Sequence, residues 1–231
     1  MPSGFLLIDK PPGITSHDVV DRVRRVTGIR KVGHGGTLDP FATGLLIVAV
    51  GREATRELGN IIGKDKVYEA TMVLGAVSDT QDRDGKIKET GGALPTEDDL
   101  RATMAKFTGA LQQIPPMYSA KKVGGKKLYE LARAGMEIER KPADITVYDL
   151  ELLEARLPKP GFPSQASCAS FRVRCSSGTY VRTLAHDIGQ VLGCGAYLDA
   201  LRRTRIGDWS VEQAVKLDEL TDENWQGRLI H

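Results

Sequence analysis

Residues 33–46 of this chain read GHGGTLDPFATGLL, and the prediction of the fold starts from them. This stretch begins as a loop sequence in which glycines and a proline surround one carboxylate, Asp39. It then runs into Leu45–Val50, the longest strictly apolar run of the chain, which predicts a buried strand. Glycines let the backbone approach a ligand closely, and Pro40 fixes the chain just after the carboxylate. Composition alone also allows a plain turn in which Asp39 caps its own backbone.

Around this loop the sequence predicts strands and helices mixed without a regular βαβ rhythm, which favours an α+β fold. A helix is expected to begin after Thr15, where Asp18 completes a capping box, and to end before Gly28. Alternation over Val67–Leu74 predicts a half-buried strand with Tyr68 on its apolar face. The remaining expected elements are strands at 5–8 and 171–175, helices at 53–62, 96–107, 128–134, 183–192 and 196–203, an irregular stretch at 113–127 and a flexible connection at 155–169.

The composition is that of an ordinary globular protein, because 41% of its 231 residues are hydrophobic and 27% are charged. The formal net charge of +2 excludes a histone-like electrostatic binder, although charges segregated on one face would still allow nucleic acid to bind. No apolar run is long enough to span a membrane, and the N-terminus does not resemble a signal peptide. The three cysteines form no CxxC pair, which predicts a reduced, cytoplasmic protein without a disulfide framework or a cysteine zinc site.

Positive charge is concentrated in three segments of a chain that is nearly neutral overall. Such segregation is what an RNA-binding face requires, although the first segment equally fits a solvated helix face. In the second segment, neighbouring glycines favour a loop that orders on contact with phosphate. The three sets are Arg22, Arg24, Arg25, Arg30 and Lys31; Lys121, Lys122, Lys126 and Lys127; and Arg202, Arg203 and Arg205.

Six segments, taken in order, resemble the motifs of the tRNA pseudouridine synthase B (TruB) family. The catalytic signature of that family is similar to residues 33–46, and the resemblance covers about residues 5–220. Two positions depart from the usual pattern: Gly35 stands where threonine is common, and Ala143 where a basic residue is common. The other matching segments are DKPPGITS at 9–16, KVYEA at 66–70 with the run 75–85, PPMYSAKK at 115–122 with GKKLYELAR at 125–133, GTYVRTL at 178–184 and LRRT at 201–204.

The resemblance implies a pseudouridine synthase fold, with a mixed, largely antiparallel sheet flanked by helices. An RNA-gripping insertion is expected at about residues 113–142. We expect residues 1–231 to form a single catalytic domain without the PUA-like domain into which bacterial members commonly continue.

The resemblance also assigns three catalytic residues. Asp39 becomes the essential carboxylate, acting either as a nucleophile at C1′ of the ribose or as a base that removes a ribose proton. Arg182 becomes the guanidinium that keeps Asp39 ionised and oriented. Tyr68 becomes the surface on which the flipped uracil stacks, and takes part in removing the C5 proton. Without the resemblance, Arg182 would be a surface arginine at a helix start and Tyr68 a core tyrosine.

Further residues are expected to contact the substrate or to support the loop. Tyr180 and Arg182 lie two apart, so in an extended segment their side chains would point the same way. The resemblance places His34 in the space left by the flipped base and Leu201 on the apolar wall of the pocket, while Lys10 with Pro11 would buttress the loop. Lys121, Lys122, Lys126 and Lys127 would contact phosphates. No metal or organic cofactor is expected, because the leaving base returns to the same sugar.

The function implied is that of a tRNA pseudouridine(55) synthase that takes a T-arm stem-loop as substrate. We expect a monomer with no obligate protein partner and no membrane association. Two alternatives remain at this point: a non-catalytic RNA-binding or RNA-folding protein of the same fold, and a pseudouridine synthase acting on another RNA. Intact Asp39, Tyr68 and Arg182 argue against the first, since RNA binding alone has no use for a carboxylate beside phosphates.

Overall fold

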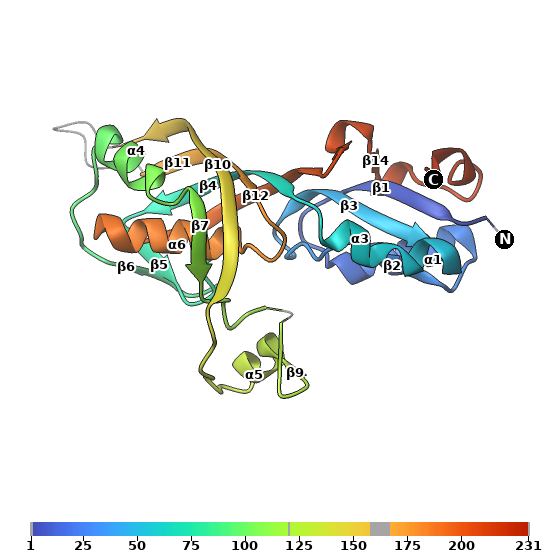
Figure 1. Cartoon of the computed structure of the whole chain (residues 1–231), viewed down its shortest axis with the longest axis horizontal. Coiled ribbons are helices and arrows are strands. Elements are labelled where there is room, and N and C mark those ends of the chain that lie inside the picture. The colour runs from blue at the N-terminus through green and yellow to red at the C-terminus, as the bar shows by residue number, and fades with distance from the viewer. Residues whose placement is uncertain (1, 120, 158–166, 231) are drawn as a thin grey trace. The chain divides into compact units, whose positions relative to one another are not determined.

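The computed structural model describes residues 2–119, 121–157 and 167–230 (Figure 1). The chain divides into two compact units, Met1–Glu69 with Leu201–His231, and Ala70–Ala200. Two strands, β4 (Lys66–Leu74) and β12 (Ala196–Ile206), begin in one unit and end in the other.

The first unit is built on β1 (Gly4–Lys10) and β3 (Thr43–Val50), which pair antiparallel along their whole length. Strand β12 runs parallel to β3, and β14 (Val215–Lys216) runs parallel to β1. The short strands β2 (Val32–His34) and β13 (Trp209–Ser210) add to β3 and β12. Three 3₁₀ helices follow β12: η1 (Val211–Gln213), η2 (Leu217–Glu219) and η3 (Gln226–Arg228).

Both faces of β1 and β3 are covered, which explains the unbroken apolar run Leu45–Val50. On one face the valines of α1 (Ser16–Thr27) pack against Leu46, Val48 and Val50. On the other face Ile61 of α3 packs against Leu45 and Ile47.

Helix α1 begins and ends where the sequence predicts. The Thr15 hydroxyl accepts a hydrogen bond from the Asp18 amide, and Oδ2 of Asp18 accepts one from the Thr15 amide at 2.8 Å. Gly28 ends the helix with φ 69°, a left-handed conformation that favours glycine. The single helix expected over 53–62 is wrong: α2 (Arg52–Arg56) and α3 (Leu58–Ile62) are separated at Glu57, where the amide bonds only three residues back, to Ala54.

In the second unit, β4, β11 (Cys168–Cys175), β10 (Ala143–Arg156) and β7 (Gly109–Gln113) are neighbours in that order. Strand β10 pairs antiparallel with both β11 and β7. Helices α4 (Glu97–Ala105) and α6 (Val181–Leu192) pack against each other, and α4 also contacts β10. A separate hairpin joins β5 (Ala76–Ser78) to β6 (Ile87–Glu89).

The expected insertion stands out from the sheet of its own unit, between β7 and β10 (Figure 1). It is less irregular than expected, because β8 (Lys122–Val123) and β9 (Lys126–Lys127) form a tight hairpin ahead of α5 (Leu128–Arg133). Of the flexible connection expected at 155–169, residues 158–166 lie outside the described residues.

The predicted fold class is confirmed: helices flank a mixed sheet of ten strands, and most of the strand pairs are antiparallel. The helix expected over 196–203 is wrong, because these residues belong to β12, which pairs with β3 and β13. Strand β10 was not predicted. No described helix is both long enough and apolar enough to cross a membrane.

Candidate active site

The Asp39 loop belongs to the first unit and is fastened to the start of α1. The buried Ser16 hydroxyl donates to the Leu38 carbonyl at 3.0 Å and accepts from the Leu38 amide at 2.8 Å. The Gly13 amide donates to the Pro40 carbonyl at 2.9 Å. The backbone on both sides of Asp39 is therefore fixed, while Asp39 itself is half-buried.

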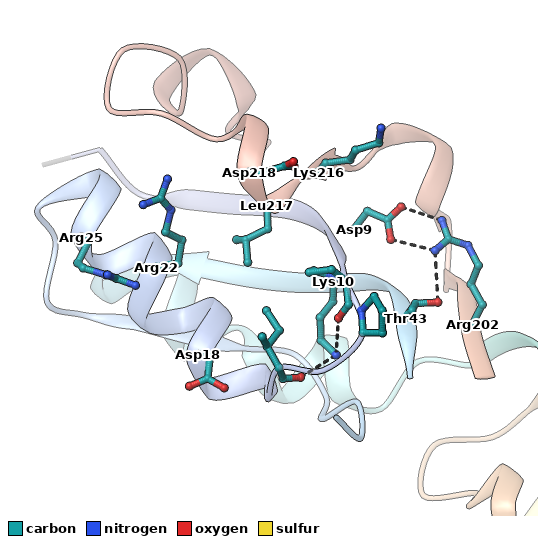
Figure 2. A pocket seen from close by; sticks show the side chains of 13 residues that line it. Asp9, Lys10, Asp18, Arg22, Arg25, Thr43, Arg202, Lys216, Leu217 and Asp218 are labelled. Atoms are coloured by element: carbon teal, nitrogen blue, oxygen red, sulfur yellow. Dashed lines mark hydrogen bonds and ion pairs between the residues drawn. The ribbon is translucent and has the colours of Figure 1, made fainter. Parts of the chain in front are cut away.

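The side chain of Lys10 supports the same loop. It is fully buried, and Nζ donates to the carbonyls of Pro11 (2.8 Å), Ile14 (2.8 Å) and Pro40 (3.2 Å), the first two drawn in Figure 2. Burial lowers the pKa of Lys10 to about 8, and the Asp39 carboxylate opposes that shift. All three protons of the ammonium group are used by backbone, so Lys10 holds the loop rather than reaching out to RNA.

Arg203 is a supporting residue that the sequence did not reveal. Only 1% of Arg203 is exposed, and Nε donates to the Leu45 carbonyl at 2.7 Å. Nη2 donates to the Gly36 carbonyl at 3.0 Å, and Nη1 to the Thr37 carbonyl at 3.5 Å. Gly44 has φ +101°, and a Cβ there would lie 2.3 Å from the Arg203 carbonyl oxygen, so the approach requires glycine. The expectation that Arg203 faces RNA is wrong, because its guanidinium is committed to the loop.

His34 lies on β2 with its ring largely buried. Burial, aided by the positive charges of Arg203 and His17, lowers its pKa. The imidazole is therefore neutral at pH 7. Within the described part of the chain, its buried Nδ1 has no hydrogen-bond partner.

The departure at Gly35 has a local packing reason. A Cβ built on Gly35 would lie 2.5 Å from Cγ2 of Ile61 in α3. In this chain, the Ile61 side chain fills the space that a side chain at position 35 would need.

Tyr68 and Leu201 also belong to the first unit. Each is 8% exposed, Tyr68 on the inner face of β4 and Leu201 on β12. Their expected positions around a flipped uracil stay predictions.

Arg182 belongs to the second unit and is buried, so the interpretation as a surface arginine is wrong. Its Nη1 lies 3.2 Å from Oδ2 of Asp82 and 3.1 Å from the Thr80 carbonyl, and Nη2 donates to the Tyr118 carbonyl at 2.8 Å. Asp82 is equally buried and accepts at Oδ1 from the Thr80 hydroxyl (2.6 Å) and the Asp84 amide (3.1 Å). The guanidinium is thus held in one orientation by a buried ion pair and two carbonyls.

The turn that carries Asp82 is itself constrained. Gln81 has φ 65°, the one left-handed non-glycine residue in the described chain. Its side-chain carbonyl accepts from the Thr183 hydroxyl at 2.7 Å, and its backbone carbonyl accepts from the Leu198 amide at 3.0 Å. Such a conformation costs of order 1–3 kcal/mol and persists where its surroundings over-determine it, as at many functional sites.

Tyr180 does not relate to Arg182 as the sequence predicted. It is the N-cap of α6, and Val181 is already helical, so strand alternation does not carry to Arg182. The backbone of Tyr180 is instead clamped by Gln113, which accepts from its amide at 2.8 Å and donates to its carbonyl at 3.1 Å.

Of the insertion lysines, Lys121 and Lys126 are exposed. Lys122 and Lys127 are register partners in the β8–β9 hairpin. The Lys121 carbonyl accepts from the Leu128 amide at 2.9 Å, which ties the hairpin to α5. Contact of these lysines with phosphate stays a prediction.

The expected site residues therefore fall into two sets. Asp39, His34, Lys10, Tyr68 and Leu201 lie in the first unit, and Arg182, Tyr180 and the insertion lysines in the second. The pairing of Arg182 with Asp39 stays a prediction. Across the described ranges, no three His, Cys, Asp or Glu side chains are grouped to hold a metal ion.

Comparison with known proteins gives two family matches. Residues 24–181 match the model of the TruB family pseudouridylate synthase N-terminal domain, and residues 182–229 match that of the tRNA pseudouridylate synthase B C-terminal domain. A curated protein named tRNA pseudouridine synthase B from Syntrophotalea carbinolica is 49% identical over 219 residues, 94% of this chain and 68% of that one. The protein of the same name from Chlamydia trachomatis serovar L2 is 46% identical over 212 residues, 92% of this chain and 84% of that one.

Solved structures show the same fold in a larger protein. A chain in the structure described as a Cbf5-Nop10-Gar1 complex is 32% identical, with a TM-score of 0.70 over 96% of this chain. A chain in a structure of an H/ACA RNP bound to a substrate RNA containing 2′-deoxyuridine is 31% identical, with a TM-score of 0.68 over 99% of this chain. This chain spans only 54% and 56% of the length of those two.

Proposed function

Because the chain belongs to the TruB family of pseudouridylate synthases, we propose that it converts the T-loop uridine of tRNA, conventionally position 55, to pseudouridine. The observation that carries the proposal is the Asp39 loop, whose backbone is held on both sides of the half-buried Asp39 by Lys10, Ser16 and Arg203. Holding a reacting group in one geometry is the part of catalysis that a fold supplies best.

The reaction is an isomerisation, so the product has the same atomic composition as uridine. The N1–C1′ bond breaks, the base turns, and C5 bonds to C1′; the proton on C5 is then lost, and N1 gains one. A stacked uracil cannot be reached, so the nucleotide first flips into a pocket.

Asp39 acts in the ionised form in either of its two possible roles. As a nucleophile it would attack C1′ as the base leaves; as a base it would remove a ribose proton.

Arg182 is the proposed partner of Asp39. Its guanidinium already pairs with Asp82, so it is oriented before RNA binds. A guanidinium can serve two carboxylates because it carries five N–H donors in one plane.

The remaining site residues receive and replace the base. Tyr68 would stack on the flipped uracil and take part in removing the C5 proton, with Leu201 as the apolar wall and Tyr180 beside it. His34 would occupy the space that the base leaves, which suits a neutral ring better than a charged one. The insertion lysines would contact the RNA backbone.

The proposal includes the setting in which the enzyme works. The chain would act as a monomer on the T-arm stem-loop, in the cytoplasm, without an obligate protein partner. A synthase acting on another RNA is the second candidate, since a chain in the structure of an H/ACA RNP bound to a substrate RNA is 31% identical. The tRNA enzyme is favoured because its relatives are 46–49% identical.

The test is to incubate the purified protein with a T-arm stem-loop and to map pseudouridine at nucleotide resolution. A stem-loop with cytidine at the target position is the matched control. Pseudouridine at the target alone supports the proposal. RNA binding without product would instead favour the non-catalytic alternative, and product in other RNAs but not in the T arm would favour the second candidate.

A further inference from the structure

A hollow of about 630 Å³ opens in the first unit beside the Asp39 loop (Figure 2). Its apolar lining comes from Pro11, Pro12 and Ile14 after β1 and from Leu217 of η2. Its volume is in the range of small-ligand pockets, and none of the residues assigned to the reaction except Lys10 lines it.

One end of the hollow adjoins the catalytic loop. Lys10, which lines the hollow, bonds to the Pro40 carbonyl next to Asp39. Thr43, at the start of β3, lines the same end together with the ion pair of Asp9 and Arg202, whose nitrogens and oxygens are 2.7 and 3.0 Å apart. A molecule in the hollow would therefore lie beside the loop that carries Asp39.

The wall formed by α1 carries two arginines, Arg22 and Arg25 (Figure 2). Three residues apart, they lie on one face of the helix. Neither has a hydrogen bond or ion pair within the described chain. Arg24, by contrast, is bound to Asp21 at 2.8 Å and to the Val32 carbonyl at 3.2 Å.

Most other charges that line the hollow already have partners. Asp9 forms an ion pair with Arg202, and the Asp18 carboxylate accepts a hydrogen bond from the Thr15 amide in the capping box. Nζ of Lys216 lies 3.8 Å from Oε1 of Glu219. The two arginines are thus cations available for an anionic ligand, next to an apolar surface.

We propose that this hollow binds a nucleotide of the substrate RNA adjacent to the target uridine. The base lies on the apolar lining, and its phosphate pairs with Arg22 and Arg25. The inference rests on the proposed function. When the target flips, its neighbour loses a stacking partner, and an apolar surface beside a cation is what single-stranded nucleotides bind in place of a neighbouring base.

The first test concerns the phosphate. Affinity for the stem-loop is measured against salt for the double variant Arg22→Ala, Arg25→Ala. The control is Arg52→Ala, Arg56→Ala on α2, whose two arginines are exposed and lie outside the hollow. Each lost phosphate contact should reduce the logarithmic salt slope by about 0.7–0.9. The control should keep the wild-type slope.

The second test concerns the base. Stem-loops with an abasic nucleotide on either side of the target should bind wild type about 5- to 150-fold more weakly at one of the two positions. That penalty should shrink in Leu217→Ala, which removes lining. It should persist in Leu229→Ala, because Leu229 packs on the same core cluster but does not line the hollow.

Two results would overturn the proposal: the same salt slope in both arginine double variants, or the same abasic penalty in both leucine variants. Product assays separate this failure from that of the proposed function. If wild type forms pseudouridine while neither expected difference is seen, only the nucleotide site is wrong. If wild type forms none, the proposed function fails, whatever the binding results.

Discussion

Nη1 of Arg182 lies 3.2 Å from Oδ2 of Asp82, and both side chains are almost fully withdrawn from solvent. The two residues are 100 positions apart in the sequence, yet they form the ion pair on which the orientation of a proposed catalytic arginine depends.

Replacing Asp82 by asparagine should therefore affect both stability and turnover. The amide keeps the shape but removes the charge, so we expect the free energy of unfolding to fall by about 3 kcal/mol. Turnover should fall by about 10², because Arg182 loses its fixed orientation. Denaturant unfolding and single-turnover kinetics measure the two effects. Glu151→Gln is the control, since its pair with Arg172 is exposed and should contribute less than about 1 kcal/mol; equal effects in the two variants would contradict the prediction.

Asp39→Asn should abolish turnover while RNA binding survives. The amide is nearly isosteric with the carboxylate, but it can neither attack C1′ nor accept a proton. Pseudouridine yield and stem-loop affinity are measured on the same preparation. Product formation within tenfold of wild type would remove Asp39 from the mechanism.

Lys10 should give the protein a measurable dependence of stability on pH. Its folded pKa of about 8 lies below the ordinary value of 10.5, so between these pH values the unfolded chain binds a proton that the folded chain does not. Stability attributable to Lys10 should therefore rise from pH 8 to pH 10.5 and be flat below pH 8. The measurement is the difference in unfolding free energy between wild type and Lys10→Met at pH 7.5 and at pH 10.

Lys10→Met should also be less stable than wild type at both pH values. Three partly buried carbonyls lose their donor, and a net loss of about 0.5–1.5 kcal/mol is expected for each hydrogen bond. A stability difference that does not change between pH 7.5 and pH 10 would show that Lys10 keeps its ordinary pKa.

Two substitutions at Tyr68 separate stacking from proton transfer. Tyr68→Phe keeps the ring, so RNA affinity should stay normal, while loss of the hydroxyl should slow chemistry by about 10²–10⁴. Tyr68→Leu should lose stacking as well, worth roughly 1–3 kcal/mol of binding. Single-turnover kinetics with saturating enzyme are compared with separately measured affinities. Near-normal chemistry in the Phe variant would leave Tyr68 as a stacking surface only.

The insertion lysines should contribute to the salt dependence of RNA binding. Replacing Lys121, Lys122, Lys126 and Lys127 by alanine should lower the logarithmic slope by about 0.7–0.9 for each true phosphate contact. Affinity is measured over a series of salt concentrations. A slope equal to that of wild type would assign these lysines to solvent.

Local patterns predicted the elements whose signals are local. Helix α1 was found from its capping box and terminal glycine, and β4 from its alternation, because these depend on neighbouring residues. The prediction of a helix over residues 196–203 was wrong because alanine, leucine and arginine favour helices. Pairing of β12 with β3 and β13 makes these residues a strand. That pairing lies beyond any short window.

The same limit explains which site residues were missed. The Asp39 loop and Lys10 were predicted as site residues because they lie in segments 33–46 and 9–16, which resemble family motifs. Arg203 looked like one cation in a basic run, and nothing in its neighbourhood indicates that it reaches carbonyls more than 150 positions away. Asp82 likewise gave no sign of its pair with Arg182, since the two meet only through the fold.

The hydrogen bonds from Arg203 to the Asp39 loop, which we call the Arg203 clamp, cannot form until late in the synthesis of these segments. The Gly36 carbonyl leaves the ribosome 167 residues before its guanidinium partner, a delay of about ten to thirty seconds at ordinary elongation rates. Throughout that interval β1 and β3 can pair, but the loop between α1 and β3 lacks its clamp. The nascent chain can therefore complete the support of the Asp39 loop only after β12 has emerged from the ribosome, however early β1 and β3 have paired.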